Sequence, residues 1–292
     1  MRESMKKALR GLLAAAVLAV FTVPTTNAAA VDRTKVESSL RVGGFVTIAP
    51  DGSVAGHELD SQAQLSPALT AFIDRAVAHW RFSPVVVDGQ AVRVRVPMSL
   101  RLVLRPTPDG NYEARIASTW FMSGSDGAQA DTNTQRVARR MQPPVYPTEA
   151  LRMGGKGVVY LNVTYGPDGK VTQVYARQVN LRVLGTEAQM DRMRDQFAEA
   201  SIRAARRWVF APPTTGKEAE RAVWSVVVPV DFRLSGEAGP RPGEWETYVP
   251  GPIRNPPGQS RDPLAEGSPD ALPDSGVYSV EQSARLLTPP AA

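Results

Sequence analysis

The chain has 292 residues, with 25 prolines, 23 glycines, two histidines, no cysteine and a formal net charge of +5. The lack of cysteine excludes disulfides, thiolate nucleophiles and cysteine-built zinc sites, and two histidines leave little room for a polyhistidine metal centre. No G-x-S-x-G, H-E-x-x-H, P-loop or dinucleotide-binding motif occurs, so we predict neither an enzyme nor a cofactor.

Residues 1–30 have the pattern of a secretory signal. A basic segment containing Lys6 and Lys7 precedes an apolar run at 12–23, and small residues follow up to Ala30. The run of about 12 residues is shorter than the roughly 20 needed to span a bilayer. We therefore predict cleavage and a periplasmic chain with no stable membrane anchor. An uncleaved segment would instead anchor the chain in the inner membrane.

The net charge is distributed unevenly. Residues 1–30 carry +3, residues 31–234 carry +6 and residues 235–292 carry −4. Cleavage of the signal leaves only +2. This gives weak support for nucleic-acid binding, and we predict no nucleic-acid partner.

Two stretches, 41–105 and 142–234, share an ordered set of landmarks, with 106–141 as the linker between them. Each has a glycine followed by apolar residues, a Pro-Asp-Gly turn, a Trp-x-Phe-x-Pro segment and an alternating apolar run that contains a proline. In the first stretch the landmarks lie at 44–48, 50–52, 80–84 and 96–102. In the second they lie at 157–161, 167–169, 208–212 and 228–234. The shared order predicts an internal repeat.

Each copy is predicted to form a β-hairpin, a helix and a third strand. Apolar alternation predicts strands at 44–49 and 94–102 in the first copy, and at 157–165, 171–179 and 226–234 in the second. Apolar residues recur every three or four positions from Leu65 to Trp80 and from Met190 to Trp208, which predicts the two helices. The predicted fold class is α+β, with two modules that each pack a three-stranded antiparallel sheet on one helix.

The third strand of each predicted module contains a proline, Pro97 or Pro229. A proline within a sheet is confined to edges, bulges and strand starts, so we predict that these strands lie at sheet edges. A free edge can accept a strand from another protein. The alternative is an edge that the protein itself covers.

The second copy resembles the C-terminal domain of TonB-family proteins. The resemblance rests on the sequence Pro-Val-Tyr-Pro at 144–147, on the landmarks of the second stretch and on their order, and it covers about 142–234. The first copy, about 41–105, is a divergent relative that lacks the Tyr-Pro motif. In that family the domain lies in the periplasm and binds a short segment of an outer-membrane TonB-dependent receptor, which adds as a strand beside the domain's third strand.

The resemblance therefore implies an outer-membrane receptor, or another envelope protein, as the partner. The implied partner-binding positions lie before the Tyr-Pro motif and along the third strand: Gln142, Pro143, Tyr146, Val223, Ser225, Val226, Val227, Val228, Asp231 and Arg233. A TonB energy transducer also has an uncleaved N-terminal helix with a functional histidine and a long Pro-rich linker before this domain. Here the Pro-rich stretch follows the domain, so coupling to the proton-motive force is not predicted.

The stretch 235–292 contains 11 prolines and 7 glycines and few aliphatic residues. This composition predicts a disordered or loosely attached tail. A second interpretation of the whole chain stays open. It is a structural envelope protein whose modules pair edge to edge, within the chain or in a homodimer, without energy transduction.

Overall fold

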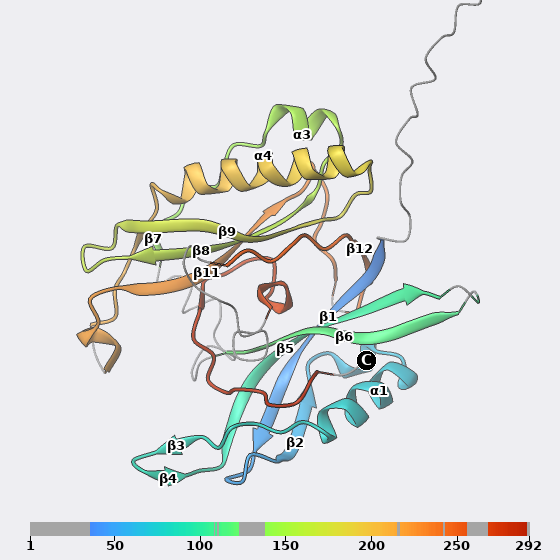
Figure 1. Ribbon diagram of the computed structural model, residues 1–292, viewed down its shortest axis with the longest axis vertical. Coiled ribbons are helices and arrows are strands. Elements are labelled where there is room, and N and C mark those ends of the chain that lie inside the picture. The colour runs from blue at the N-terminus through green and yellow to red at the C-terminus, as the bar shows by residue number, and fades with distance from the viewer. Residues whose placement is uncertain are drawn as a thin grey trace, which may run out of the picture. The chain divides into compact units, whose positions relative to one another are not determined.

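The computed structural model describes residues 36–107, 109, 111–122, 138–214, 217–241, 243–255 and 268–290. The predicted signal at 1–30 lies outside these residues. In the described part the fold is α+β, built mostly from antiparallel sheets with few helices (Figure 1).

The first sheet has the strand order β12-β1-β5-β6, and β2 also pairs with β1. Its strands are β1 (Glu37–Ile48), β2 (Val54–Leu59), β5 (Val94–Pro106), β6 (Tyr112–Phe121) and β12 (Glu246–Tyr248). Burial alternates along most of β1, as expected for a strand with one face in a core. Strand β1 is long enough to pair on one edge with β12 near its start and with β2 near its end.

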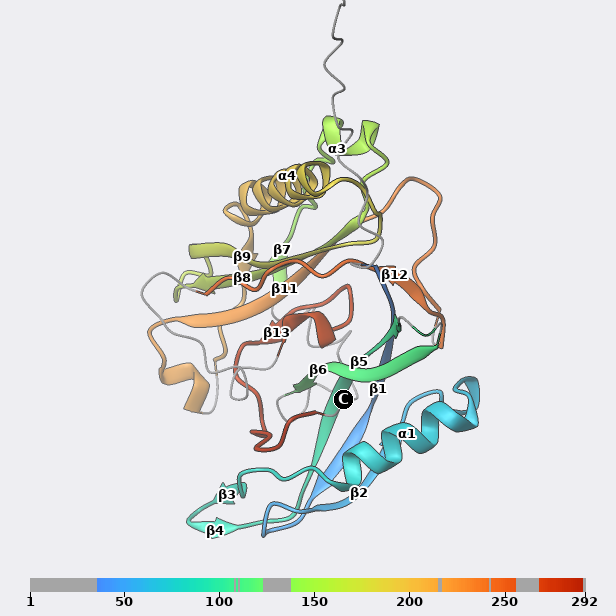
Figure 2. The ribbon, with the colours of Figure 1, turned by 45° about the vertical axis from the view of Figure 1, so that its right-hand side comes forward.

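Helix α1 (Pro67–Ala78) covers one face of the first sheet (Figure 2). It begins after Ser66, whose side chain accepts a hydrogen bond from the Leu69 N–H, as an N-cap residue does. Its apolar side buries Ile73 and Val77 in a core that also holds Trp80 and Phe82. A 3-10 turn (Gln62–Gln64) precedes α1, and a small hairpin of β3 (Val86–Val87) and β4 (Gln90–Ala91) follows it.

The predicted edge position of the first copy's last strand is wrong over most of that strand. Strand β6 comes from the interval 106–141, which was expected to be a linker, and it pairs with β5 from Met98 to Pro106. Pro97 lies where this pairing ends, and its carbonyl accepts the Met122 N–H at 2.9 Å. The missing N–H of Pro97 therefore falls at the end of the ladder, so a proline fits there although β5 is an inner strand.

The second sheet has the order β13-β11-β8-β9. Its strands are β8 (Gly157–Tyr165), β9 (Val171–Leu181), β11 (Trp224–Phe232) and β13 (Tyr278–Ser279). Helix α4 (Glu187–Ala205) lies along one face of this sheet (Figure 1) and begins with a capping box formed by Thr186 and Gln189. The strands and helix expected between 157 and 234 are present, and the apolar side of α4 is buried against the sheet.

Short elements complete the second half of the chain. They are β7 (Ala138–Arg140), which pairs with β10 (Val209–Phe210), helix α3 (Thr148–Arg152), and the 3-10 turns Lys217–Glu220 and Pro269–Ala271.

The hairpin turns of the two sheets make the same contacts. Gly52 and Gly169 have φ of 82° and 76°, which favours glycine. The carbonyl of Gly52 accepts the Phe82 N–H at 2.8 Å, and that of Gly169 accepts the Phe210 N–H at 2.9 Å. A Cβ on either glycine would collide with the carbonyl oxygen of the same phenylalanine. In both sheets the turn thus fixes the aromatic segment that follows the helix.

The described part of the tail is folded onto both sheets, contrary to the prediction of a disordered or loosely attached segment. Strand β12 pairs with β1, and β13 pairs with β11. The next stretch reaches the first sheet, where Leu286 bridges to Phe82. The tail contributes a few well-separated apolar side chains to the cores: Tyr248, Val249, Ala271, Leu272, Tyr278, Ala284 and Leu286. Composition alone does not reveal such sparse, long-range burial.

Candidate functional site

The site predicted from the sequence lies along the outer edge of β11. This strand pairs with β8 over its whole length, but β13 covers it only at Val226 and Val227. The Val280 N–H donates to the carbonyl of Ser225 at 3.4 Å, so the backbone of Ser225 faces away from β8. Backbone directions alternate along a strand, and Val227, Pro229 and Asp231 therefore face the same way.

Beyond Val227 the outer edge of β11 has no strand beside it among the described residues. Pro229 lies on this stretch, where its missing N–H interrupts no bond to β8. The predicted edge position of this strand is confirmed for the stretch around Pro229, and it is wrong at Val226 and Val227, where β13 pairs with β11. A strand added here would find the carbonyl of Pro229 and the N–H and C=O of Asp231 facing it.

A groove of about 380 Å³ runs beside this open edge. Residues 228–233 form one side of the groove, and the tail residues 274–277 lie across from them. The remaining wall comes from the segment before α3 and from the aromatic segment after α4: Met141, Gln142, Pro143, Pro144, Tyr146 and Trp208. An open strand edge next to a partly apolar groove can take both the backbone and alternate side chains of an extended segment.

Aromatic contacts hold the Tyr146 wall in place. The Tyr146 ring packs edge-on against Phe197 of α4 at 5.8 Å and against Phe232 of β11 at 5.4 Å, and its hydroxyl donates to the carbonyl of Gly155. Burial, with a smaller effect of the nearby carboxylates, raises the pKa of the Tyr146 hydroxyl. Trp208 Nε1 donates to the carbonyl of Gln142 at 2.8 Å. This wall is therefore formed before any partner arrives.

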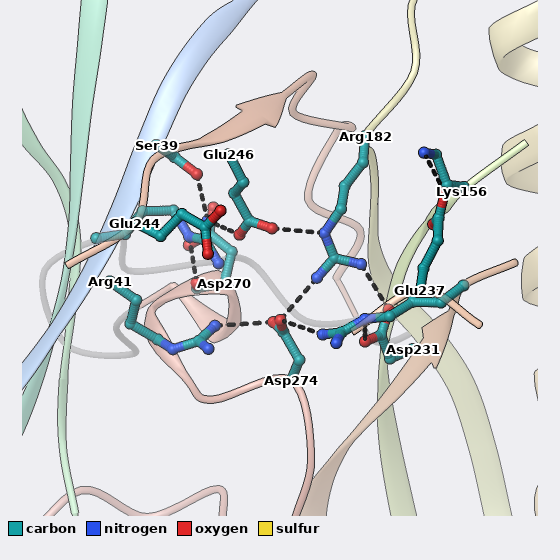
Figure 3. Close-up of polar contacts among 12 residues, drawn as sticks. Ser39, Arg41, Lys156, Arg182, Asp231, Glu237, Glu244, Glu246, Asp270 and Asp274 are labelled. Atoms are coloured by element: carbon teal, nitrogen blue, oxygen red, sulfur yellow. Dashed lines mark hydrogen bonds and ion pairs between the residues drawn. The ribbon is translucent and has the colours of Figure 1, made fainter. Parts of the chain in front are cut away.

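A cluster of charges closes one end of the groove. Asp274 of the tail accepts from Arg41 of β1 at 2.8 Å, from Arg182 after β9 at 2.6 Å and from Arg233 after β11 at 3.3 Å (Figure 3). Arg182 also donates to Asp231 at 2.5 Å, and Arg233 pairs with Asp231. Four segments far apart in the sequence meet at one carboxylate.

The two aspartates of this cluster are in different electrostatic environments. Asp274 is only 7% exposed, and burial alone would raise its pKa. The surrounding guanidinium groups of Arg41, Arg182 and Arg101 outweigh burial and hold the pKa of Asp274 below its ordinary value. For Asp231 burial dominates, so the pKa of this carboxyl is raised despite Arg182. Asp274 therefore carries the firmer negative charge.

A second buried arginine lies next to this cluster. Arg101 of β5 is 2% exposed. It donates to Ser39 Oγ at 2.7 Å and to the Asp270 carbonyl at 2.5 Å, and it lies 4.9 Å from the centre of the Tyr248 ring. Arg182 also donates to Glu246 of β12 at 2.7 Å. The tail is thus held by arginines that come from both sheets.

The structure brings together six of the ten predicted site residues. These six line the groove: Gln142, Pro143, Tyr146, Val228, Asp231 and Arg233. Three others, Ser225, Val226 and Val227, lie at the end of β11 that β13 covers. Val223 precedes β11 and is 49% exposed.

Four residues of this site were not predicted from the sequence: Arg41, Arg182, Trp208 and Asp274. Trp208 had a sequence signal, because it stands in the repeated Trp-x-Phe segment, but that signal predicts core packing. No local pattern marks Asp274, which lies 233 residues from Arg41 along the chain.

The described residues form a strand edge beside a groove, in an α+β fold. Comparison with known proteins finds similarity to TonB proteins. This chain is 32% identical to the protein tonB2 of Pseudomonas aeruginosa over 92 residues. The matched stretch is 32% of this chain and 29% of that protein. Over 109 residues, which are 37% of its length, the chain is 33% identical to the TonB proteins of two strains of Xanthomonas campestris and covers 41% of each.

No family model and no solved structure matches the chain. The chain matches less than half the length of these relatives. Over that stretch it is TonB-like. In the part of the chain that the structure describes, we find no helix long and apolar enough to cross a membrane.

Proposed function

We propose that this chain is a TonB-like protein of the cell envelope that binds an extended segment of an outer-membrane transporter or another envelope protein. The segment adds as a strand to the outer edge of β11, and this binding supports transport across the envelope. The observation that carries the proposal is the edge of β11 beyond Val227, which no strand of the described residues pairs with and which runs along a preformed groove. The similarity to TonB proteins supports it, and we place the protein in the periplasm after removal of 1–30.

The proposal includes the internal repeat. In it, 41–105 and 142–234 are two TonB C-terminal-like modules. The matched contacts of Gly52 with Phe82 and of Gly169 with Phe210 support this assignment. A second matched contact agrees: Trp80 Nε1 donates to the Pro290 carbonyl at 2.8 Å, as Trp208 Nε1 does to that of Gln142.

The edge-to-edge alternative receives less support. Among the described residues, no strand of the first sheet pairs with a strand of the second, and the tail strands β12 and β13 pair with them instead. A homodimer through the open part of β11 stays a proposal, and sedimentation of the purified protein tests it.

Site-specific photo-crosslinking in intact cells tests the proposed function. A photoreactive residue at Gln142, which is exposed on the groove wall, should crosslink to an outer-membrane transporter identified by mass spectrometry. The same residue at Glu199, on the exposed side of α4, is the matched control. Crosslinks to no envelope protein, or the same crosslinks from both positions, would contradict the proposal.

The backbone direction of β11 selects a binding variant. Val226 and Val228 face β8, so a proline at either position would break the sheet itself. Asp231→Pro removes an N–H that faces the groove and should abolish the crosslink. Asp231→Asn keeps this N–H and should retain more of it.

A further inference from the structure

Strand β13 lies on the same edge of β11 that the proposed function assigns to a partner. Ser279 is opposite Val226, Tyr278 is opposite Val227, and the Val280 N–H bonds to Ser225. A partner strand that extended along the whole of β11 would need the place that β13 holds. The tail and the partner therefore compete for one row of backbone groups.

The backbone contacts of β13 are few. On the N-terminal side of Tyr278, between Asp274 and Val277, the tail bends away from β11. Gly276 has a φ of 116°, and the Tyr278 hydroxyl donates to the carbonyl of Ser275 at 2.6 Å. A Cβ on Gly276 would lie 2.7 Å from that hydroxyl oxygen, so the bend depends on glycine. Two opposed residue pairs form a much weaker attachment than a full strand.

Side chains provide the rest of the attachment. Asp274 is held by Arg41, Arg182 and Arg233. Four residues later, the Tyr278 side chain is buried with Val227 and Tyr160 in an apolar cluster. The tail thus binds the edge through one carboxylate and one buried aromatic ring.

The tail is also attached on both sides of this stretch. Before it, Ala271 and Leu272 are buried. After it, the Phe121 N–H donates to Gln282 Oε1 at 2.9 Å, and the Ser283 N–H donates to the Phe121 carbonyl at 3.2 Å. The stretch 274–280 can leave β11 while its flanks remain bound, so it competes at a high local concentration.

We propose that 274–280 is an internal ligand of the β11 edge, and that a partner strand replaces it by presenting its own carboxylate to Arg41, Arg182 and Arg233. This inference rests on the proposed function and adds the chemistry of the partner. When 274–280 leaves, three guanidinium groups lose their shared carboxylate. Asp231 and Glu246 still pair with these arginines, but two negative charges do not balance three positive ones. The partner segment that fits is extended and carries an acidic residue, with an apolar or aromatic residue four positions later when it runs in the tail's direction.

The test uses a fluorescent synthetic peptide with the sequence of residues 272–282 and the full chain. The peptide should bind weakly to the wild-type chain because the internal copy occupies the edge. Asp274→Asn in the chain weakens the internal copy and should tighten peptide binding by about tenfold or more, because it raises the fraction of chains with a free edge. Equal affinity of the two chains would overturn the proposal.

A reversible tether shows whether the edge is the binding place. The chain has no cysteine, so Val226→Cys with Ser279→Cys, added to the Asp274→Asn chain, gives a single disulfide between directly opposite residues. Oxidation should abolish peptide binding, and reduction should restore it. The matched control, Ser38→Cys with Thr247→Cys, ties β12 to β1 and should leave binding unchanged. Binding that survives oxidation of the first pair would overturn the proposal.

Two further variants separate strand pairing from charge. Val280→Pro removes the N–H that bonds to Ser225 and should also tighten peptide binding, with Asp274 still in place. A peptide in which the aspartate is replaced by asparagine should bind about tenfold more weakly, and equal binding would overturn the carboxylate requirement. If the peptide behaves as expected but Gln142 crosslinks to no envelope protein, the proposed function fails, and with it the replacement by a partner strand, whereas the assignment of 274–280 as an internal ligand of the β11 edge stands.

Discussion

Strands β5 and β11 are the corresponding strands of the two sheets, and they differ in how much of their outer edge is covered. Each contains a proline, Pro97 or Pro229, before a run of apolar residues. In the first sheet the chain turns directly after β5, with Thr107 N–H bonded to the Asn111 carbonyl, and returns as β6, which pairs with β5 from Met98 to Pro106. In the second sheet the chain leaves after β11, and in the part that the structure describes the strand that returns to this edge is the short β13.

The difference shows that a strand's own sequence does not decide whether its edge is open. Each proline lies where the outer side of its strand needs no N–H donor. Among the described residues, the edge after Pro97 is paired with β6, and the edge after Pro229 is unpaired. What decides is the segment that comes next: a ten-residue strand covers β5, and a two-residue strand covers β11. The predictions below test this contrast, beginning with the largest expected effect.

Phe82→Ala and Phe210→Ala should have similar, large effects on the stability of their own sheets. Both rings are about 1% exposed, and both backbones bond to the glycine of a hairpin turn. Each substitution should lower the free energy of unfolding by about 3–5 kcal/mol. Urea unfolding measures the total loss, and hydrogen exchange locates it. A loss under about 1 kcal/mol for one of them would show that the two segments are not equivalent.

Arg182→Ala should be the next most destabilising change. It removes the one guanidinium that pairs with all three of Asp231, Glu246 and Asp274. A buried carboxylate left unpaired costs about 3–5 kcal/mol, and the loss here should be smaller because Arg41, Arg101 and Arg233 still pair with these carboxylates. Because the three carboxylates come from β11, β12 and the tail, hydrogen exchange should increase at all three. Loss of protection at β11 alone would contradict the role of Arg182 in attaching the tail.

The stability that Asp274 contributes should depend on pH. Its pKa is lower in the folded chain than in the unfolded chain, so the contribution is complete above the unfolded value of about 3.9 and is lost as pH falls through the lower folded value. Urea unfolding of the wild-type and Asp274→Asn chains between pH 3 and 7 checks this.

The difference between these two chains should be constant near neutral pH and shrink below about pH 4. Asp231 is present in both chains, and arginine side chains keep their charge over this pH range, so the difference isolates Asp274. The stability that Asp231 contributes should change with pH in the opposite direction, because burial raises the pKa of Asp231 in the folded chain. A difference that grows as the pH is lowered would contradict the assignment.

Glu199→Gln should have the smallest effect. Glu199 pairs with Arg203 one turn later on α4 at 3.4 Å, and both side chains are more than half exposed. Such pairs contribute about 0.3–0.5 kcal/mol. Thermal unfolding and peptide binding should be almost unchanged, which makes this the reference for the buried cluster. A loss above about 1 kcal/mol would mean that surface charge matters generally in this chain.

The sequence allows much of the second sheet to be predicted and little of the charged cluster. Alternation at 157–165 and a helical period through Met190 and Phe197 are local signals, and they correctly predict β8 and α4. The groove wall at Gln142, Pro143 and Tyr146 follows from the resemblance, but the wall formed by the tail does not. Contacts of Asp274 with Arg41 and Arg182 join residues that only the folded chain brings together. Strand β6 was missed because its alternation, which includes Ile116 and Trp120, is interrupted by polar residues.

Strand β12 has a mechanical consequence. Its three residues bond to β1, and the next residue, Val249, exchanges two backbone hydrogen bonds with Leu181 at the end of β9. Four consecutive residues, 246–249, therefore connect the two sheets through main-chain bonds. A force that pulls on the start of β1 can pass through this link into β9, which lies at the edge of the second sheet away from β11. The link itself therefore uses no backbone group of the edge that is open to a partner.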